Sequence, residues 1–171
     1  MEQITMSAAV SVTGVATFDR SWRSQFRRMH RAFDRLHGVA PLTNSFIAAD
    51  VEDGFMSFFQ AAWHLKDWLW NDPQSAPLVR ADIEVYANQY PKLKLAADLA
   101  NGAKHLGLNR KTRTGDASTD MRTMRFGGDP TVGLTATIEV TSQGVTYDAV
   151  QLARDVISLW EAYLARKNLV A

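Results

Sequence analysis

The chain has 171 residues, 46% of them hydrophobic and 10% aromatic, and it contains no cysteine. This composition predicts one folded domain, excludes wholesale disorder, and rules out disulfides, thiolate nucleophiles and zinc sites built on cysteine. The net charge is only +1 but is unevenly placed, since residues 20–37 carry six arginines and one aspartate, and residues 104–125 carry six basic and two acidic residues.

The first helix is predicted to follow a loose N-terminal arm at residues 1–18, which are mostly small and β-branched. From Ser21 onward, apolar residues recur at steps of three and four, as on one face of a helix: Trp22, Phe26, Met29, Phe33 and Leu36. Ser21 is suited to cap this helix, and Gly38 stands where it would end. Arginines cover the remaining surface, namely Arg20, Arg23, Arg27, Arg28, Arg31 and Arg35.

Further helices are predicted between residues 45 and 106, separated by turns that contain proline. The central helix runs from Ser45 to Asn71 and is followed by Asn-Asp-Pro, a strong stop signal. The next helix covers residues 76–89. The one after it runs from Pro91 to Leu106 and has its proline in the first turn, where proline fits best. Short links of this kind are typical of an up-down bundle.

The last third of the chain changes its period. Residues 107–120 are polar and basic, which predicts a loop, and residues 131–147 alternate apolar and polar side chains around a turn at Ser142–Gly144, which predicts a β-hairpin. Met121–Phe126 is a candidate third strand, and Asp148 is suited to cap a final helix at Ala149–Asn168. The predicted fold is therefore mainly α, an up-down bundle of about five helices in a single domain at 19–171, with a β-hairpin inserted before the C-terminal helix.

Two of these helices carry one line of polar residues on an otherwise apolar surface. In the central helix the line is Asp53, Ser57, Gln60, His64, Asp67 and Asn71. In the helix that starts at Pro91 it is Lys94, Asp98, Asn101 and His105. A helix that is apolar around most of its surface is normally buried. We therefore expect both lines to face a shared interior space that brings His64 near His105.

Three interpretations fit the two polar lines. They form a structural hydrogen-bond network or meet solvent. Alternatively they bind a metal, since imidazole and carboxylate are zinc and iron ligands. In the third, leading interpretation they act on RNA or nucleotides, because a histidine transfers protons near neutral pH. The Glu-x-x-His pairs of di-iron bundles and the His-Glu-x-x-His motif are both absent, so the leading interpretation includes no metal or other cofactor.

Residues 98–105, DLANGAKH, precede a basic loop and resemble the signature helix of HEPN-type bundles. The family motif is an arginine, usually followed by a polar residue, with a histidine about four to six residues beyond. His105 matches the histidine and Asn101 the polar residue, whereas Ala100 stands where the arginine is most often found. Over residues 44–108, the resemblance implies a compact all-α domain, commonly dimeric and often an RNase of toxin and defence systems.

The leading functional prediction is a HEPN-like domain that binds RNA or nucleotides and cleaves RNA without a metal. In this prediction His105 is the general acid/base, His64 the second proton carrier or a residue that orients the first, and Lys104 the cation on the phosphate. The predicted substrate-binding residues are Asn101, Asp98, Asp67, Arg110, Lys111 and Arg113. A non-catalytic protein-interaction module of antitoxin or defence type is the alternative, and a metal-binding bundle is the second alternative.

Partners and location are also predicted from the sequence. We expect a homodimer, with Trp70 near the end of the central helix as a candidate contact, and RNA or a protein as further partners. No stretch of about 18 apolar residues occurs, so no membrane association is expected. The first residues lack the basic and apolar regions of a signal peptide, which predicts a cytoplasmic protein.

Overall fold

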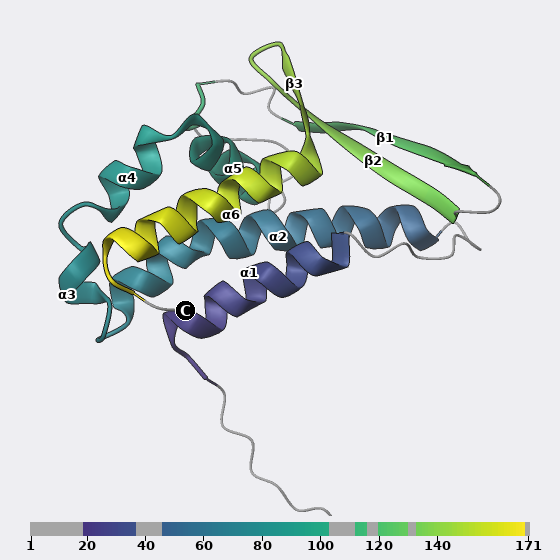
Figure 1. The fold of residues 1–171 in the computed structure, drawn as a ribbon. Coiled ribbons are helices and arrows are strands. Elements are labelled where there is room, and N and C mark those ends of the chain that lie inside the picture. The colour runs from purple at the N-terminus through teal and green to yellow at the C-terminus, as the bar shows by residue number, and fades with distance from the viewer. Residues whose placement is uncertain (1–18, 37–45, 103–111, 116–119, 130–132, 170–171) are drawn as a thin grey trace, which may run out of the picture.

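The computed structural model describes residues 19–36, 46–102, 112–115, 120–129 and 133–169. Its elements in chain order are α1 (Trp22–Leu36), α2 (Phe46–Asn71), α3 (Ala76–Val79), α4 (Ile83–Gln89), α5 (Pro91–Gly102), β1 (Asp120–Asp129), β2 (Gly133–Ser142), β3 (Val145–Asp148) and α6 (Ala149–Arg166). The fold is mainly helical with the strands placed before the last helix, which confirms the predicted fold class (Figure 1). The predicted N-terminal arm lies outside the described residues.

The helix α1 is amphipathic, and its first turn is capped by two side chains. Ser21 Oγ accepts a hydrogen bond from the Ser24 amide at 3.3 Å, which confirms Ser21 as a cap. Asp72, in the turn after α2, accepts the Trp22 amide at 2.9 Å with one carboxylate oxygen and the Gln74 amide at 2.8 Å with the other. A negative charge at a helix N-terminus is favoured by the helix dipole. Asp72 therefore fastens the start of α1 to the far end of α2.

The core lies among the bundle helices and is rich in aromatic residues. Its largest fully buried side chains include Trp22, Phe55, Phe58, Phe59, Trp160 and Tyr163. In α1 the predicted apolar positions Trp22, Phe26 and Met29 are buried, and α6 packs against α1, α2 and α5. Removing such large apolar surfaces from water supplies much of the stability that holds the helices together.

The region predicted as one helix at residues 76–89 is two short helices, α3 and α4, so this prediction is wrong. The chain breaks at Arg80–Asp82, where Asp82 occupies the position before α4. Asp82 does not cap its own helix. Instead its carboxylate accepts the Tyr163 hydroxyl at 2.8 Å and lies 2.8 Å from the Lys167 ammonium, both in the last part of the chain. This contact with α6 outweighs local helix propensity, which is weak by comparison.

The three strands form an antiparallel sheet in the order β1-β2-β3, which confirms the predicted hairpin and the candidate third strand. The turn between β2 and β3 has Gln143 and Gly144 at φ 51° and 73°, the left-handed pair that a two-residue hairpin turn requires. Ile138 and Val140 are buried. Asp148 follows directly and accepts the Gln151 amide at 2.7 Å, so it caps α6 as predicted. Figure 1 shows β1 and β2 extending beyond the helices.

Candidate functional site

The structure describes part of the site predicted from the sequence. The predicted site residues outside the described ranges are His105, Lys104, Arg110 and Lys111. Those within the described ranges are His64, Asp67, Asp98, Asn101 and Arg113. The contacts of this second group define what the visible part of the site can do.

The polar line of α2 faces outward. Asp53, Ser57, Asp67 and Asn71 are exposed, and Gln60 and His64 are half-buried. The prediction that this line turns toward a shared interior space is therefore wrong for α2. The reason is that α1, α5 and α6 all pack against the wide apolar arc of α2 and leave one narrow strip in contact with water. The polar residues occupy that strip.

The polar line of α5 is divided between core and surface. Asn101 is exposed, whereas Asp98 is only 1% exposed. The Asp98 carboxylate accepts three hydrogen bonds from the segment after α5: from the Arg113 amide at 2.7 Å, the Thr114 amide at 2.8 Å and the Thr114 hydroxyl at 2.6 Å. A buried carboxylate needs such partners, and hydrogen bonds to a charged acceptor are strong. Asp98 thus anchors residues 113 and 114 on α5.

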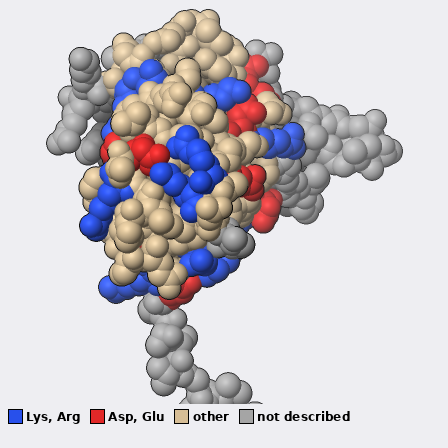
Figure 2. Space-filling model, turned by 60° about the vertical axis from the view of Figure 1, so that its left-hand side comes forward, with Lys and Arg blue, Asp and Glu red and all other residues tan. Residues whose placement is uncertain are grey.

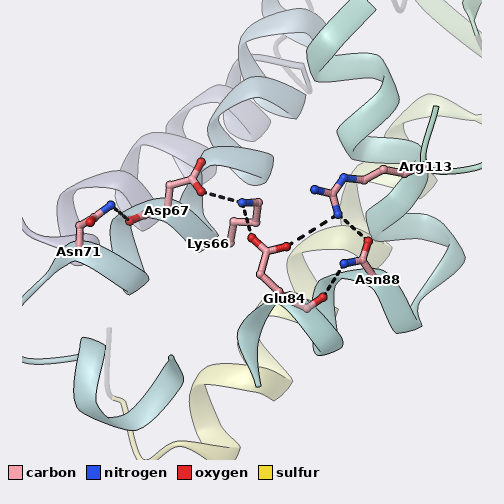
Figure 3. A network of polar contacts seen from close by, with 6 residues as sticks. All are labelled: Lys66, Asp67, Asn71, Glu84, Asn88 and Arg113. Carbon is pink, nitrogen blue, oxygen red and sulfur yellow. Dashed lines mark hydrogen bonds and ion pairs between the residues drawn. The ribbon is translucent and has the colours of Figure 1, made fainter. Parts of the chain in front are cut away.

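From this anchor the Arg113 side chain extends over α2. Its guanidinium carbon lies 4.3 Å from the centre of the Trp63 ring, in cation–π contact. The guanidinium also donates to the Asn88 amide oxygen and lies 3.8 Å from a carboxylate oxygen of Glu84 (Figure 3). Arg113 is therefore fixed by an aromatic ring below it and by two acceptors from α4.

The Lys66 side chain, from α2, approaches Glu84 and Trp63, which are also partners of Arg113. Its ammonium lies 2.7 Å from Glu84 and 2.6 Å from Asp67, and 5.0 Å from the centre of the Trp63 ring. Figure 3 shows Glu84 between Lys66 and Arg113. We refer to Lys66, Asp67, Glu84, Asn88 and Arg113 as the ion-pair network. Its two cations and two carboxylates balance in charge.

The protonation of Lys66 follows from these contacts. Its side chain is only 10% exposed, and burial by itself disfavours the ammonium form. The hydrogen bonds to Asp67 and Glu84 outweigh burial and raise the pKa of Lys66 above its ordinary value. Lys66 is therefore a fixed cation rather than a proton donor near neutral pH.

The outer surface of α1 and the residues just before it carry a second group of cations, which we call the arginine face: Arg20, Arg27, Arg28, Arg31 and Arg35, all exposed. Arg27 pairs with Asp19 at 2.6 Å. Arg28 donates to Gln25 and lies 5.6 Å from the centre of the Trp68 ring. Among the residues that the structure describes, Arg20, Arg31 and Arg35 have no hydrogen-bond or ion-pair partner.

A third group of charges lies where α6 ends. Lys167 and Arg166 approach Asp82 at 2.8 and 3.4 Å, and Arg166 lies over the Tyr86 ring. Burial would raise the pKa of Asp82, but the hydrogen bonds from Lys167 and Tyr163 lower it below its usual value. Figure 2, turned so that the α3 side of Figure 1 comes forward, shows basic and acidic side chains interspersed on this side of the molecule. Asp82 therefore offsets part of the positive charge of these two cations.

A cavity of about 430 Å³ lies apart from the residues predicted for the site. It is lined by Tyr90, Pro91, Lys92, Asp155, Ser158 and Leu159. Lys92 and Asp155 in this lining pair at 2.6 Å. The cavity is therefore an open, largely apolar hollow between α5 and α6, with an internally balanced charge pair.

Within the residues that the structure describes, no three His, Asp or Glu side chains come together as a metal-binding group. No helix in the same ranges is long and apolar enough to cross a bilayer. No family model matches the chain, and no curated protein or solved structure matches it significantly. The site must therefore be interpreted from its own geometry.

Sequence reasoning missed most of the ion-pair network. The sequence predicts Asp67 and Arg113 as substrate-binding residues, but it does not identify Lys66, Glu84 or Asn88. A signal existed, because Lys66 is the one lysine within the apolar arc of α2, and such a residue needs a nearby acid. Glu84 and Asn88 are four residues apart on α4, so they share one face of that helix.

Proposed function

We propose that this protein binds RNA through the arginine face of α1. The observation that carries the proposal is that Arg20, Arg31 and Arg35 are exposed and have no partner among the described residues. Cations that are not neutralised within the protein are available to phosphates, and they release condensed counterions when they bind a nucleic acid. Contacts of this kind position a nucleic acid without reading its sequence.

The helix that carries the arginine face is packed against the core on its opposite side. Trp22, Met29 and Ala32 on the opposite face of α1 are at most 1% exposed, so the helix is firmly seated in the core. The guanidinium groups therefore project from a fixed backbone. Binding costs less conformational entropy when only the side chains have to be ordered.

The proposal is tested by the fluorescence anisotropy of a labelled RNA titrated with protein at several salt concentrations. We expect the double variant R31E/R35E to weaken binding and to reduce the slope of log affinity against log salt by about two, one for each lost phosphate contact. The control is R154E, which reverses one exposed arginine on α6 and should leave the salt slope unchanged. Equal affinities for wild type and the double variant, or a wild type that does not bind RNA, would refute the proposal.

Cleavage of the bound RNA is the finer part of the proposal and depends on His105. In this chain the positions that would hold the arginine of the HEPN motif are Ala100, Leu99 and Asp98, each at most 3% exposed. The cation on the phosphate must therefore come from elsewhere, and Lys104 or the arginine face are the candidates. With EDTA present, we expect wild type to shorten a labelled RNA, H105A to leave it intact and H64A to slow the reaction. Equal rates for wild type and H105A would contradict this role.

A second candidate function, self-association, is based on exposed apolar residues on three successive helices, α2, α3 and α4. Trp70 is 39% exposed, Leu78 on α3 47% and Val85 on α4 68%. Large exposed apolar side chains on neighbouring elements are typical of contact surfaces. We expect L78D to shift the molar mass measured by light scattering toward the monomer. The control V145D changes an equally exposed apolar residue on β3, and the same shift in both variants would argue against a contact at α3.

A further inference from the structure

Two arginine–tryptophan pairs lie on α2, one on each side of its outward strip. Arg28 of α1 lies over Trp68, and Arg113 lies over Trp63. Trp63 and Trp68 are five residues apart, which places them roughly 140° apart around a helix that turns about 100° per residue. The two stacked guanidiniums are therefore held on opposite flanks of the same helix.

The strip between these flanks offers hydrogen-bonding groups. Gln60 and His64 fall between the two tryptophans on the helix surface and are half-buried. Asp67 also lies there, but it pairs with Lys66 at 2.6 Å, so its negative charge is offset locally. A ligand that crosses the strip thus meets an amide and an imidazole between two cations. The distance to be spanned is about 10 Å, the diameter of a helix with its side chains.

The guanidinium groups of Arg28 and Arg113 are held in place and are partly exposed to solvent. Arg113 keeps 32% of its side chain exposed while Trp63 and Asn88 fix its position. Arg28 is exposed and held by Gln25 and Trp68. A guanidinium stacked on a ring keeps donors at its edge, and those donors match the geometry of a phosphate. Each pair therefore offers a phosphate contact whose side chain is already ordered.

We propose that single-stranded RNA crosses α2 between Arg28 and Arg113, with phosphates on the two guanidiniums and a base against Gln60 and His64. This inference rests on the proposed RNA binding and names the path and the form of the RNA. A single strand is favoured because its unstacked bases can reach side chains, whereas a duplex presents its backbone and a shallow groove. The arginine face and Arg113 then act on the same molecule, although they belong to separate parts of the sequence.

The experiment compares a single-stranded RNA of about ten nucleotides, within the range of single-strand site sizes, with the matching duplex. Anisotropy is measured for wild type, R28M and R113M. We expect tighter binding of the single strand and about a tenfold loss in each variant, the size of one charge-assisted hydrogen bond. The salt slope should fall by about one in each. The control is R166M, because Arg166 also stacks on tyrosines and faces an acid but lies on α6, away from the strip.

Two further readouts separate a lost contact from a lost fold. R113K keeps the charge but loses the planar guanidinium stacked on Trp63, so we expect it to keep the salt slope of wild type and to recover only part of the affinity that R113M loses. Ultraviolet crosslinking should attach RNA to the α2 segment that contains His64. Wild-type affinity in both R28M and R113M would overturn this inference. If R31E/R35E still lost binding in that case, RNA binding would stand and only the path across α2 would fail. A preference for duplex, or crosslinks confined to α1, would also overturn it.

Discussion

The arginine face of α1 and the ion-pair network contain the same kind of residue in opposite situations. Arg31 and Arg35 project from a surface helix and have no partner among the described residues. Arg113 is enclosed by Trp63, Glu84 and Asn88, and its backbone amide is bound to Asp98. In the ion-pair network, the neighbouring acids that hold each cation in place also weaken its attraction for another anion. On α1 the charge is available because no acid has been placed beside it.

The comparison teaches that neighbouring acids, rather than the count of arginines, set how strongly each arginine attracts an anion: Arg113 keeps exposed donors but shares its charge with Glu84, whereas Arg31 and Arg35 have no described acid beside them. The described part of the chain contains several well-made pairs, such as Lys92 with Asp155 and Lys167 with Asp82. Surface pairs of this kind contribute little to stability, but they cancel the local field. Figure 2 shows such mixing on the side that it presents. A stretch of unpaired arginine is therefore the more informative feature.

The largest expected effect concerns the anchor beneath the network. D98A removes the carboxylate that accepts three hydrogen bonds, so the Arg113 and Thr114 amides lose their acceptor. We expect the free energy of unfolding in urea to fall by about 3 kcal/mol, since each bond to a charged acceptor contributes substantially. N101A, which changes the exposed residue on the same helix, should stay within about 0.5 kcal/mol of wild type. Equal losses in the two variants would show that Asp98 does not hold the segment.

A smaller effect sharpens the contrast between the two arginine environments. R113M removes a cation–π contact and two polar partners, and we expect it to lower the free energy of unfolding by about 1 kcal/mol. R31M removes an exposed arginine without a described partner and should change it by less than about 0.5 kcal/mol. Urea unfolding at one salt concentration measures both. The contrast would disappear if R31M were as destabilising as R113M.

A third effect is the response of stability to alkaline pH. The raised pKa of Lys66 means that its ammonium form stabilises the folded state, and this contribution is lost as pH rises through the folded pKa, above 10.5. Burial, with a smaller effect of Tyr90, raises the pKa of Tyr86 from 10.0 to about 12, so deprotonation of the unfolded chain costs stability between these values. We expect the urea midpoint to fall above about pH 10.

Two variants separate these contributions. K66M should remove the fall of the urea midpoint that is due to Lys66, and Y86F should remove the fall that is due to the Tyr86 phenol. The midpoint is measured at closely spaced pH values for wild type and both variants. A wild-type midpoint that stayed constant up to about pH 12 would contradict both assignments.

Most of the fold was predictable from the sequence because its signals are local and periodic. The apolar stripe of α1, the caps Ser21 and Asp148, and the alternation in β2 are all confirmed. The break between α3 and α4 was not predictable, because it depends on a contact between Asp82 and Tyr163, which are far apart in the chain. A local pattern contains no information on such a partner.

The candidate site was less predictable for a related reason. The polar line on α2 is correctly predicted, but the prediction that it faces the interior is wrong. Periodicity shows which residues share a helix face, and it does not show which faces the neighbouring helices cover. The network around Trp63 combines α2, α4 and the segment after α5, and no single helix pattern predicts that meeting. The roles of His105, Lys104, Arg110 and Lys111 stay predictions.

The cap on α1 has a consequence for how the chain is made. The carboxylate that satisfies the Trp22 amide belongs to Asp72, 50 residues later in the sequence. During synthesis from the N-terminus, the residues of α1 are therefore made well before the carboxylate that binds their first turn. Ser21 can cap the helix from the outset, whereas the bond that ties its first turn to the rest of the bundle forms only after all of α2 has been made.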